Sequence, residues 1–181
     1  QTSSAYRNRP KGPQCDPSRS AEVPARLLAG FKGYLQCDGM GSYDAIWHRK
    51  GLQQLGCFDH ARRKFKGAIK GQAKNKRNKK SGPSLADIGL GKINALYRLE
   101  RAIKDQSVAE RYAQRHKIAL PLLADLKRWL EKNLVKAENG GLTYKAIYYA
   151  LNQWDKLVRY CDDGRFAISN AGAENAIRPF A

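Results

Sequence analysis

The chain lacks several features that would place it in familiar classes of protein. No apolar run approaches the roughly 18 residues of a membrane-spanning helix. Residues 1–20 are polar and contain no apolar core of about 7 to 15 residues, so a secretory signal peptide is not expected there. The four cysteines, Cys15, Cys37, Cys57 and Cys161, form no C-x-x-C pair, which argues against zinc or thioredoxin-like redox chemistry. We expect reduced thiols in a cytoplasmic protein that does not enter a membrane.

Acidic residues are also scarce. Lys and Arg number 34 against 16 Asp and Glu, which gives a formal charge of +18. This charge favours a polyanionic partner such as nucleic acid, with an anionic membrane surface as the weaker alternative. Residues 62–80 contain ten Lys or Arg and no acid, and the stretch 74–80 is too polar to bury a face. We expect this run to contact phosphates, which positions a nucleic acid without reading its bases; a solvated loop is the alternative.

A short apolar run, Tyr34–Cys37, predicts a buried strand that ends at Asp38. Residues 55–58 predict a second strand, and residues 43–50 predict a helix between the two. A strand, helix, strand unit makes a parallel pair. The C-terminal ends of such strands are where ligand and metal sites are usually built, which makes Asp38 a candidate site residue. The alternative is that Asp38 and Gly39 form only a tight turn.

Residues 85–160 have the periodicity of amphipathic helices. Three apolar stripes predict three helices with no strand between them, packed on one another as an insertion. The stripes are Ile93, Leu96, Tyr97, Leu99 and Ile103; Ile118, Leu122, Leu123, Leu126, Trp129 and Leu130; and Ile147, Tyr148, Leu151, Trp154, Leu157 and Val158. Aromatic residues at this spacing predict core positions rather than base-stacking platforms. His116 is interpreted as a surface residue of a helix rather than a ligand.

The end of the chain predicts a last helix. Asn170 can cap a helix that continues to Arg178. Glu174 and Arg178 are four positions apart and share a face, so a simple ion pair within the helix is the plainest interpretation of the two.

Five strings of residues favour a functional role for Asp38 and Glu174: GYLQCDGMGSYDA, GCFDHARRKF, ALYRLE, YYALNQW and RYCDDGRFAISNAGAENAIRP. In this order they resemble the DDE transposases of bacterial insertion sequences, specifically the large family numbered sixty-six, from about Ser18 onward. The resemblance implies an α/β fold, a partial ribonuclease H-like mixed sheet with a mainly helical insertion. It also implies DNA cleavage and joining by phosphoryl transfer with Mg²⁺ or Mn²⁺.

The resemblance assigns roles to particular residues. Asp38 takes the place of the family's second catalytic Asp and Glu174 that of its Glu, and both would be metal ligands, since carboxylate oxygens suit such ions. His60, Arg62 and Arg63 match the family's His-x-Arg-Arg string, and we assign them to DNA or to support of the site. For His60 a purely structural role is an equal alternative. The remaining predicted DNA contacts are Lys74, Lys76, Arg77, Lys79, Lys80 and Arg178.

The expected organisation has five parts: an irregular lead-in (1–20), a ribonuclease H-like part with Asp38 (21–66), a basic loop (67–84), the helical insertion (85–160) and a return to the core with the Glu174 helix (161–181). No residue matches the family's first catalytic Asp, so we expect a C-terminal piece of a transposase that is inactive alone. Its expected partners are transposon ends and target DNA, with a homo-oligomer in the intact transposase. The alternative is a non-catalytic basic nucleic-acid-binding protein derived from a transposase.

Overall fold

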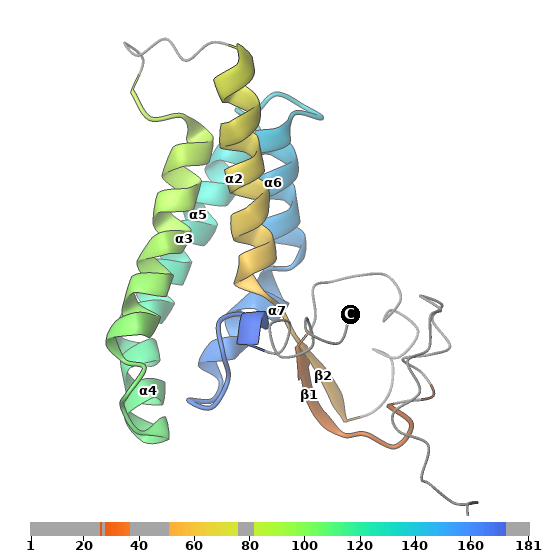
Figure 1. The fold of residues 1–181 in the computed structure, drawn as a ribbon, viewed down its shortest axis with the longest axis vertical. Coiled ribbons are helices and arrows are strands. Elements are labelled where there is room, and N and C mark those ends of the chain that lie inside the picture. Colours follow the sequence, from red (N-terminus) through yellow and green to blue (C-terminus); the bar gives the residue numbers. More distant parts are fainter. Residues whose placement is uncertain (1–25, 27, 37–50, 76–81, 173–181) are drawn as a thin grey trace, which may run out of the picture.

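A computed structural model describes residues 26, 28–36, 51–75 and 82–172. Within these ranges helices dominate and two short strands form a small sheet (Figure 1). The elements in chain order are β1 (Gly33–Gln36), β2 (Leu52–Leu55), α2 (Phe58–Asn75), α3 (Leu85–Ala102), α4 (Val108–Gln114), a π-helical turn (Arg115–Ala119), α5 (Leu120–Leu134), α6 (Leu142–Asn152), α7 (Trp154–Val158) and a 3₁₀ turn (Arg159–Cys161).

The two strands pair in parallel, with Gly33 opposite Leu52 and Gln36 opposite Leu55. The predicted parallel pairing is therefore confirmed. The second strand was expected at residues 55–58 but ends at Leu55, because the backbone N–H of Gly56 turns away and donates to the Lys156 carbonyl at 2.8 Å. The predicted helix at residues 43–50 lies outside the described residues.

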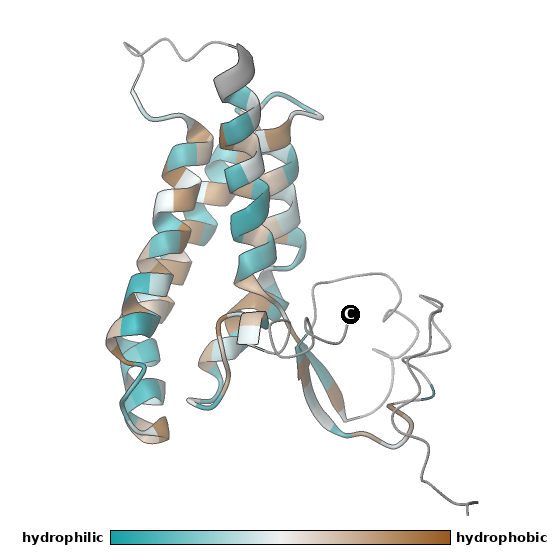
Figure 2. Ribbon diagram, viewed as in Figure 1, coloured by the Kyte–Doolittle hydropathy of each residue, from teal (hydrophilic) through white to brown (hydrophobic). Residues whose placement is uncertain are grey.

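Four long helices, α2, α3, α5 and α6, pack into a bundle beside the sheet (Figure 1). Each shows hydrophilic and hydrophobic residues in alternating patches along its length, as amphipathic helices do (Figure 2). Their apolar faces form one continuous core that includes Phe65, Ile93, Leu126, Leu130 and Ile147. The helical character predicted for residues 85–160 is therefore confirmed, although the stretch holds α4 and α7 as well as the three longer helices.

Local sequence explains where two of these helices begin. Ser84 caps α3 by accepting a hydrogen bond from the Asp87 N–H, and the Asp87 side chain accepts from the Ser84 N–H in return. Ser107 and Glu110 make the same reciprocal pair at the start of α4. Such capping boxes satisfy backbone donors that a helix start otherwise leaves without partners.

The basic stretch differs from its prediction, because α2 continues to Asn75 through the first part of the expected loop 67–84. Its apolar positions Ala61, Phe65 and Ala68 are fully buried against the other helices. This stripe, spaced four and three residues apart, holds α2 in the bundle and leaves Arg63, Lys66 and Lys70 exposed. The boundary drawn at residue 66 therefore falls inside a helix of the bundle.

Residues that the sequence assigned to the core or to the surface differ in their burial. Trp154 is buried and His116 is exposed, as predicted, but Tyr148 and Ile118, assigned to apolar stripes, are 49% and 38% exposed. Cys57 and Cys161 are free thiols. None of the described helices is long and apolar enough to cross a membrane. The fold class is thus mainly helical with a small parallel sheet.

Candidate functional site

Most predicted site residues lie outside the described part of the chain. These are Asp38, Glu174, Lys76, Arg77, Lys79, Lys80 and Arg178. Lys74 belongs to α2, but its side chain is also outside the described part. The described candidates are His60, Arg62 and Arg63, all in the first two turns of α2.

The described residues that flank Asp38 and Glu174 are tied together at one end of the sheet. The Gln36 side-chain amide, at the last position of β1, donates to the Gly56 carbonyl at 3.1 Å and to the Ala167 carbonyl at 2.9 Å. Asp38 follows Gln36 by two positions, and Glu174 follows Ala167 by seven. One glutamine therefore joins three chain segments at the C-terminal ends of both strands, and two of these segments lead to the predicted carboxylates.

Two further hydrogen bonds secure this junction. The Phe58 N–H, at the start of α2, donates to the Ile168 carbonyl at 3.0 Å. The Cys57 thiol donates to the Asn170 side-chain oxygen at 2.8 Å, and burial raises the pKa of this thiol. A neutral thiol can act as a donor, whereas a thiolate cannot, so the raised pKa preserves this contact. Sequence reasoning saw Asn170 as a helix cap and did not find its link to Cys57.

A buried arginine holds the chain segment that precedes the junction. Arg115, in the π-helical turn, is 1% exposed. Its guanidinium donates to both carboxylate oxygens of Glu100 at 3.0 and 2.7 Å, which is the paired geometry that strengthens Arg–carboxylate bonds. It also donates to the carbonyls of Tyr160, Asp163 and Phe166 at 2.8 to 2.9 Å. The loop that leads to Ile168 is therefore fastened to α3 through a single side chain.

Arg62 is held in place by residues of α3. Its Nε atom donates to the Asn94 side-chain oxygen at 2.9 Å, and its guanidinium lies 4.7 Å from the centre of the Tyr97 ring. The Tyr97 hydroxyl donates to Asp59 Oδ1 at 2.6 Å. Burial, and secondly the bond to Asp59, raise the pKa of Tyr97, so that it remains a hydroxyl donor. Sequence reasoning assigned Tyr97 to an apolar stripe, and only the packing of α2 on α3 reveals its polar role.

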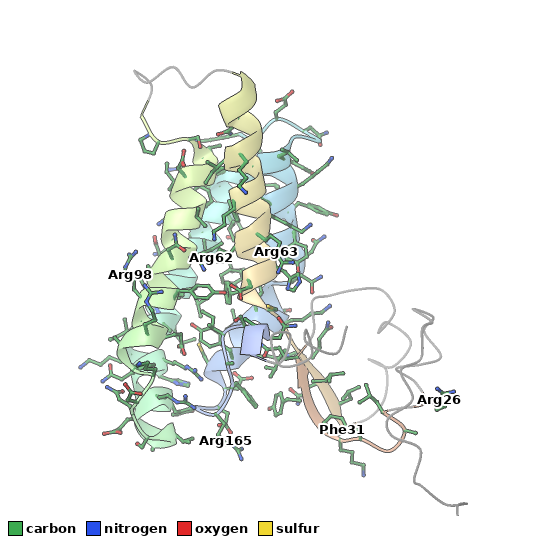
Figure 3. The ribbon with its side chains drawn as sticks, viewed as in Figure 1. Arg26, Phe31, Arg62, Arg63, Arg98 and Arg165 are labelled. Atoms are coloured by element: carbon green, nitrogen blue, oxygen red, sulfur yellow. The ribbon has the colours of Figure 1, made fainter. Side chains whose placement is uncertain are left out.

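A small open hollow lies beside this cluster. It has a volume of about 170 Å³ and is lined by Asp59, Arg62, Arg63 and Lys66. Three of the four lining side chains are cations, so the hollow suits an anion. Figure 3 shows Arg62 and Arg63 on α2, whereas Arg98 projects from α3 on the side that faces away from α2. Lys66 was not selected from the sequence, because one lysine within a basic run carries no distinguishing pattern.

The described residues do not form a metal centre by themselves. Within the described ranges no three His, Cys, Asp or Glu side chains are grouped so that they could hold a metal ion. The predicted donors, Asp38 and Glu174, are carboxylates, and carboxylate oxygens fit Mg²⁺ or Mn²⁺ by their chemistry. Any such site would depend on these two residues at the end of the sheet.

The described residues thus define a basic helical domain joined to the ends of a parallel strand pair. The family model described as "Transposase IS66 family" matches residues 14–181. The chain belongs to this family of transposases. The family that the sequence strings predicted is therefore confirmed.

Three relatives are uncharacterized proteins of Sinorhizobium fredii. The chain is 31% identical to y4hP over 170 residues, 90% of the chain and 31% of that protein. It is 32% identical to y4qI (89% of the chain, 30% of that protein) and 31% identical to y4jD (91% and 32%). The chain thus spans about a third of the length of these relatives. No solved structure matches it.

Proposed function

We propose that this chain forms part of the catalytic domain of a DDE transposase, which cleaves and joins DNA strands by phosphoryl transfer. The observation that carries the proposal is the junction at the strand ends. There Gln36, two positions before Asp38, is hydrogen-bonded to Ala167 in the segment that leads to Glu174. Together with membership of the family, this junction supports a shared site for the two carboxylates. A ribonuclease H-like arrangement of the whole domain is part of the same proposal.

Asp38 and Glu174 would be the ligands of Mg²⁺ or Mn²⁺ from this chain. When bound, such ions activate an oxygen nucleophile and neutralise charge at the phosphate. The chain's own residues have positioning roles. The Cys57–Asn170 and Phe58–Ile168 hydrogen bonds fix the end of β2 to the segment before Glu174. Fixed ligand segments matter because phosphoryl transfer depends mainly on positioning and charge neutralisation.

The charge of the chain supports DNA as the partner. A formal charge of +18 attracts the phosphate backbone, and exposed cations of α2 such as Arg63 and Lys66 are available to it. Transposon ends and target DNA would both bind through such contacts. Assembly of the intact transposase into a homo-oligomer and its residence in the cytoplasm are parts of the proposal that follow from the family alone.

A metal titration tests the site. Isothermal titration with Mn²⁺ should show binding to the wild-type chain that weakens more than about tenfold in Asp38→Asn and in Glu174→Gln, since even outer-shell partners of metal ligands typically account for about 10- to 100-fold. The matched control is Asp105→Asn, which neutralises a carboxylate whose side chain is 87% exposed. Equal Mn²⁺ affinity in all four proteins would refute the assignment of both carboxylates.

A second candidate function is non-catalytic binding of nucleic acid. It is favoured by the outward-facing cations of α2, because binding through these residues needs no metal site. DNA binding that is unaffected by Asp38→Asn and Glu174→Gln, in a protein that binds no Mn²⁺, would establish this alternative over the catalytic one.

A further inference from the structure

We propose that the hollow at the start of α2 is a binding site for the DNA backbone, with Arg62, Arg63 and Lys66 as the phosphate contacts. Tyr97 and Asn94 act as positioning residues for Arg62. The site extends the proposed function, on which it rests for the identity of the anion as DNA.

Arg62 is already oriented before any ligand arrives. Its Nε atom donates to Asn94 at 2.9 Å, and the Tyr97 ring supports the plane of the guanidinium at 4.7 Å. Among the described residues no acid forms an ion pair with Arg62. No acceptor among the described residues takes a hydrogen bond from its two Nη groups, which can donate to a phosphate through parallel N–H groups. Because the side chain is partly fixed, binding costs less side-chain entropy than at a free arginine.

Asp59 lines the hollow, and its carboxylate would oppose a bound anion most strongly if it turned toward the anion. It lies three and four positions before Arg62 and Arg63 on the helix, the spacing at which acids and bases pair. The Tyr97 hydroxyl instead donates to Asp59 Oδ1 at 2.6 Å and holds this carboxylate on the α3 side. One tyrosine thus restrains the acid with its hydroxyl and supports the arginine with its ring.

The remaining cations complete the hollow. Arg63 and Lys66 are exposed, three positions apart on one face of α2, and neither forms an ion pair with a described acid. The hollow's volume of about 170 Å³ equals that of five or six waters at about 30 Å³ each, enough for a phosphate group with part of its hydration. Lys64 belongs to a different surface, because its ammonium lies 4.7 Å from the Tyr149 ring of α6.

The location connects the hollow with the junction. The helix begins at Phe58, whose N–H is bonded to Ile168. At 1.5 Å per residue, Arg62 and Lys66 lie about 6 and 12 Å along the helix axis from that point. DNA advances about 3.4 Å per nucleotide along each strand. A phosphate held in the hollow would therefore lie about two to four nucleotides from DNA bound at the junction, close enough to set its register.

The salt dependence of DNA binding tests the contacts. Fluorescence anisotropy with a labelled 20-base-pair duplex, from 50 to 200 mM NaCl, gives the slope of log affinity against log salt. Arg62→Gln, Arg63→Gln and Lys66→Gln should each reduce the slope by about 0.9, the value for one phosphate contact. The control, Arg98→Gln, removes the same charge from an exposed position of α3 and should leave the slope unchanged. Slopes equal to that of the control would overturn the site.

Two neutral variants test the positioning roles. Tyr97→Phe and Asn94→Ala keep every charge, so the slope should stay the same while affinity falls by about 3- to 10-fold at each salt concentration, as one lost hydrogen bond of about 1 kcal/mol predicts. Wild-type affinity in both variants would refute the positioning of Arg62. Circular dichroism melting confirms that each variant is folded.

The outcome can be separated from that of the metal titration. Reduced slopes with no change of Mn²⁺ affinity in Asp38→Asn and Glu174→Gln would retain the hollow and reject the catalytic site. Unchanged slopes together with lost Mn²⁺ binding would do the reverse.

Discussion

Replacing Arg115 should destabilise this domain more than any exposed substitution. In Arg115→Ala, Glu100 loses its paired cation at a site where its own side chain is only 14% exposed. Breaking a buried ion pair from one side typically costs about 3 to 5 kcal/mol. The carbonyls of Tyr160, Asp163 and Phe166 lose their donor as well, which adds at least about 1 kcal/mol. We expect a total of about 4 to 6 kcal/mol, a large share of the roughly 5 to 15 kcal/mol that stabilises a typical domain.

Urea unfolding followed by circular dichroism measures this loss at pH 7. Arg115→Lys should fall between wild type and Arg115→Ala, since an ammonium keeps the charge but has three donors for the five hydrogen bonds. The control is Arg128→Ala, which removes a 75% exposed side chain with one ion pair at 3.8 Å and should cost less than about 1 kcal/mol. If Arg115→Ala costs no more than this control, the guanidinium does not fasten the loop.

Three further predictions concern packing, acid and thiols. Gly89→Ala should cost about 1 to 3 kcal/mol of unfolding free energy, because an added Cβ would lie 2.4 Å from the Phe65 ring. Gly67→Ala should instead stabilise α2 by up to about 1 kcal/mol, because its Cβ would meet nothing within 4 Å. The side chain and backbone N–H of Arg165 lower the pKa of Asp163 to about 2, so the stabilising contribution of Asp163 is complete above its ordinary pKa of 3.8 and is lost as the pH falls toward 2. Asp163→Asn should remove this part of the acid dependence of stability in urea titrations from pH 2 to 5. An unchanged profile would contradict the assignment. Burial raises the pKa of Cys161 to about 11, so at pH 7.5 iodoacetamide should label Cys161 far more slowly in native protein than in urea. Mass spectrometry of the Cys161 peptide measures the two labelling rates, and equal rates would count against the burial of this thiol.

The helical part of the fold was predictable because its cause is local. Ile93, Leu96 and Leu126 recur at helical spacing, and burial of that spacing requires only neighbouring helices. The length of α2 was not predictable from charge, since a run of lysines suggests a loop even when Ala61, Phe65 and Ala68 supply a narrow apolar face. Two alanines and one phenylalanine beside ten cations give too weak an apolar pattern to predict a helix.

The residues of the candidate site were also predictable only in part. Arg62 and Arg63 were found through a string that resembles a family motif, and the structure places both at one hollow. Tyr97, Asn94 and Arg115 could not be found, because their roles depend on contacts between residues 15 to 51 positions apart. A hydrogen bond between side chains of different helices leaves no periodic trace in a single sequence. The metal-ligand assignment of Asp38 and Glu174 stays a prediction.

The hydrogen bond between Phe58 and Ile168 has a consequence for how such a domain can change. The helical bundle leaves the strand ends at Phe58 and returns to them at Ile168, so its first and last residues are in contact. A segment with touching ends can be lengthened, shortened or exchanged while the strands keep their spacing. The entropy of closing the chain grows only with the logarithm of its length, about 0.6 kcal/mol for each doubling. The bundle can therefore be transplanted between relatives as a module.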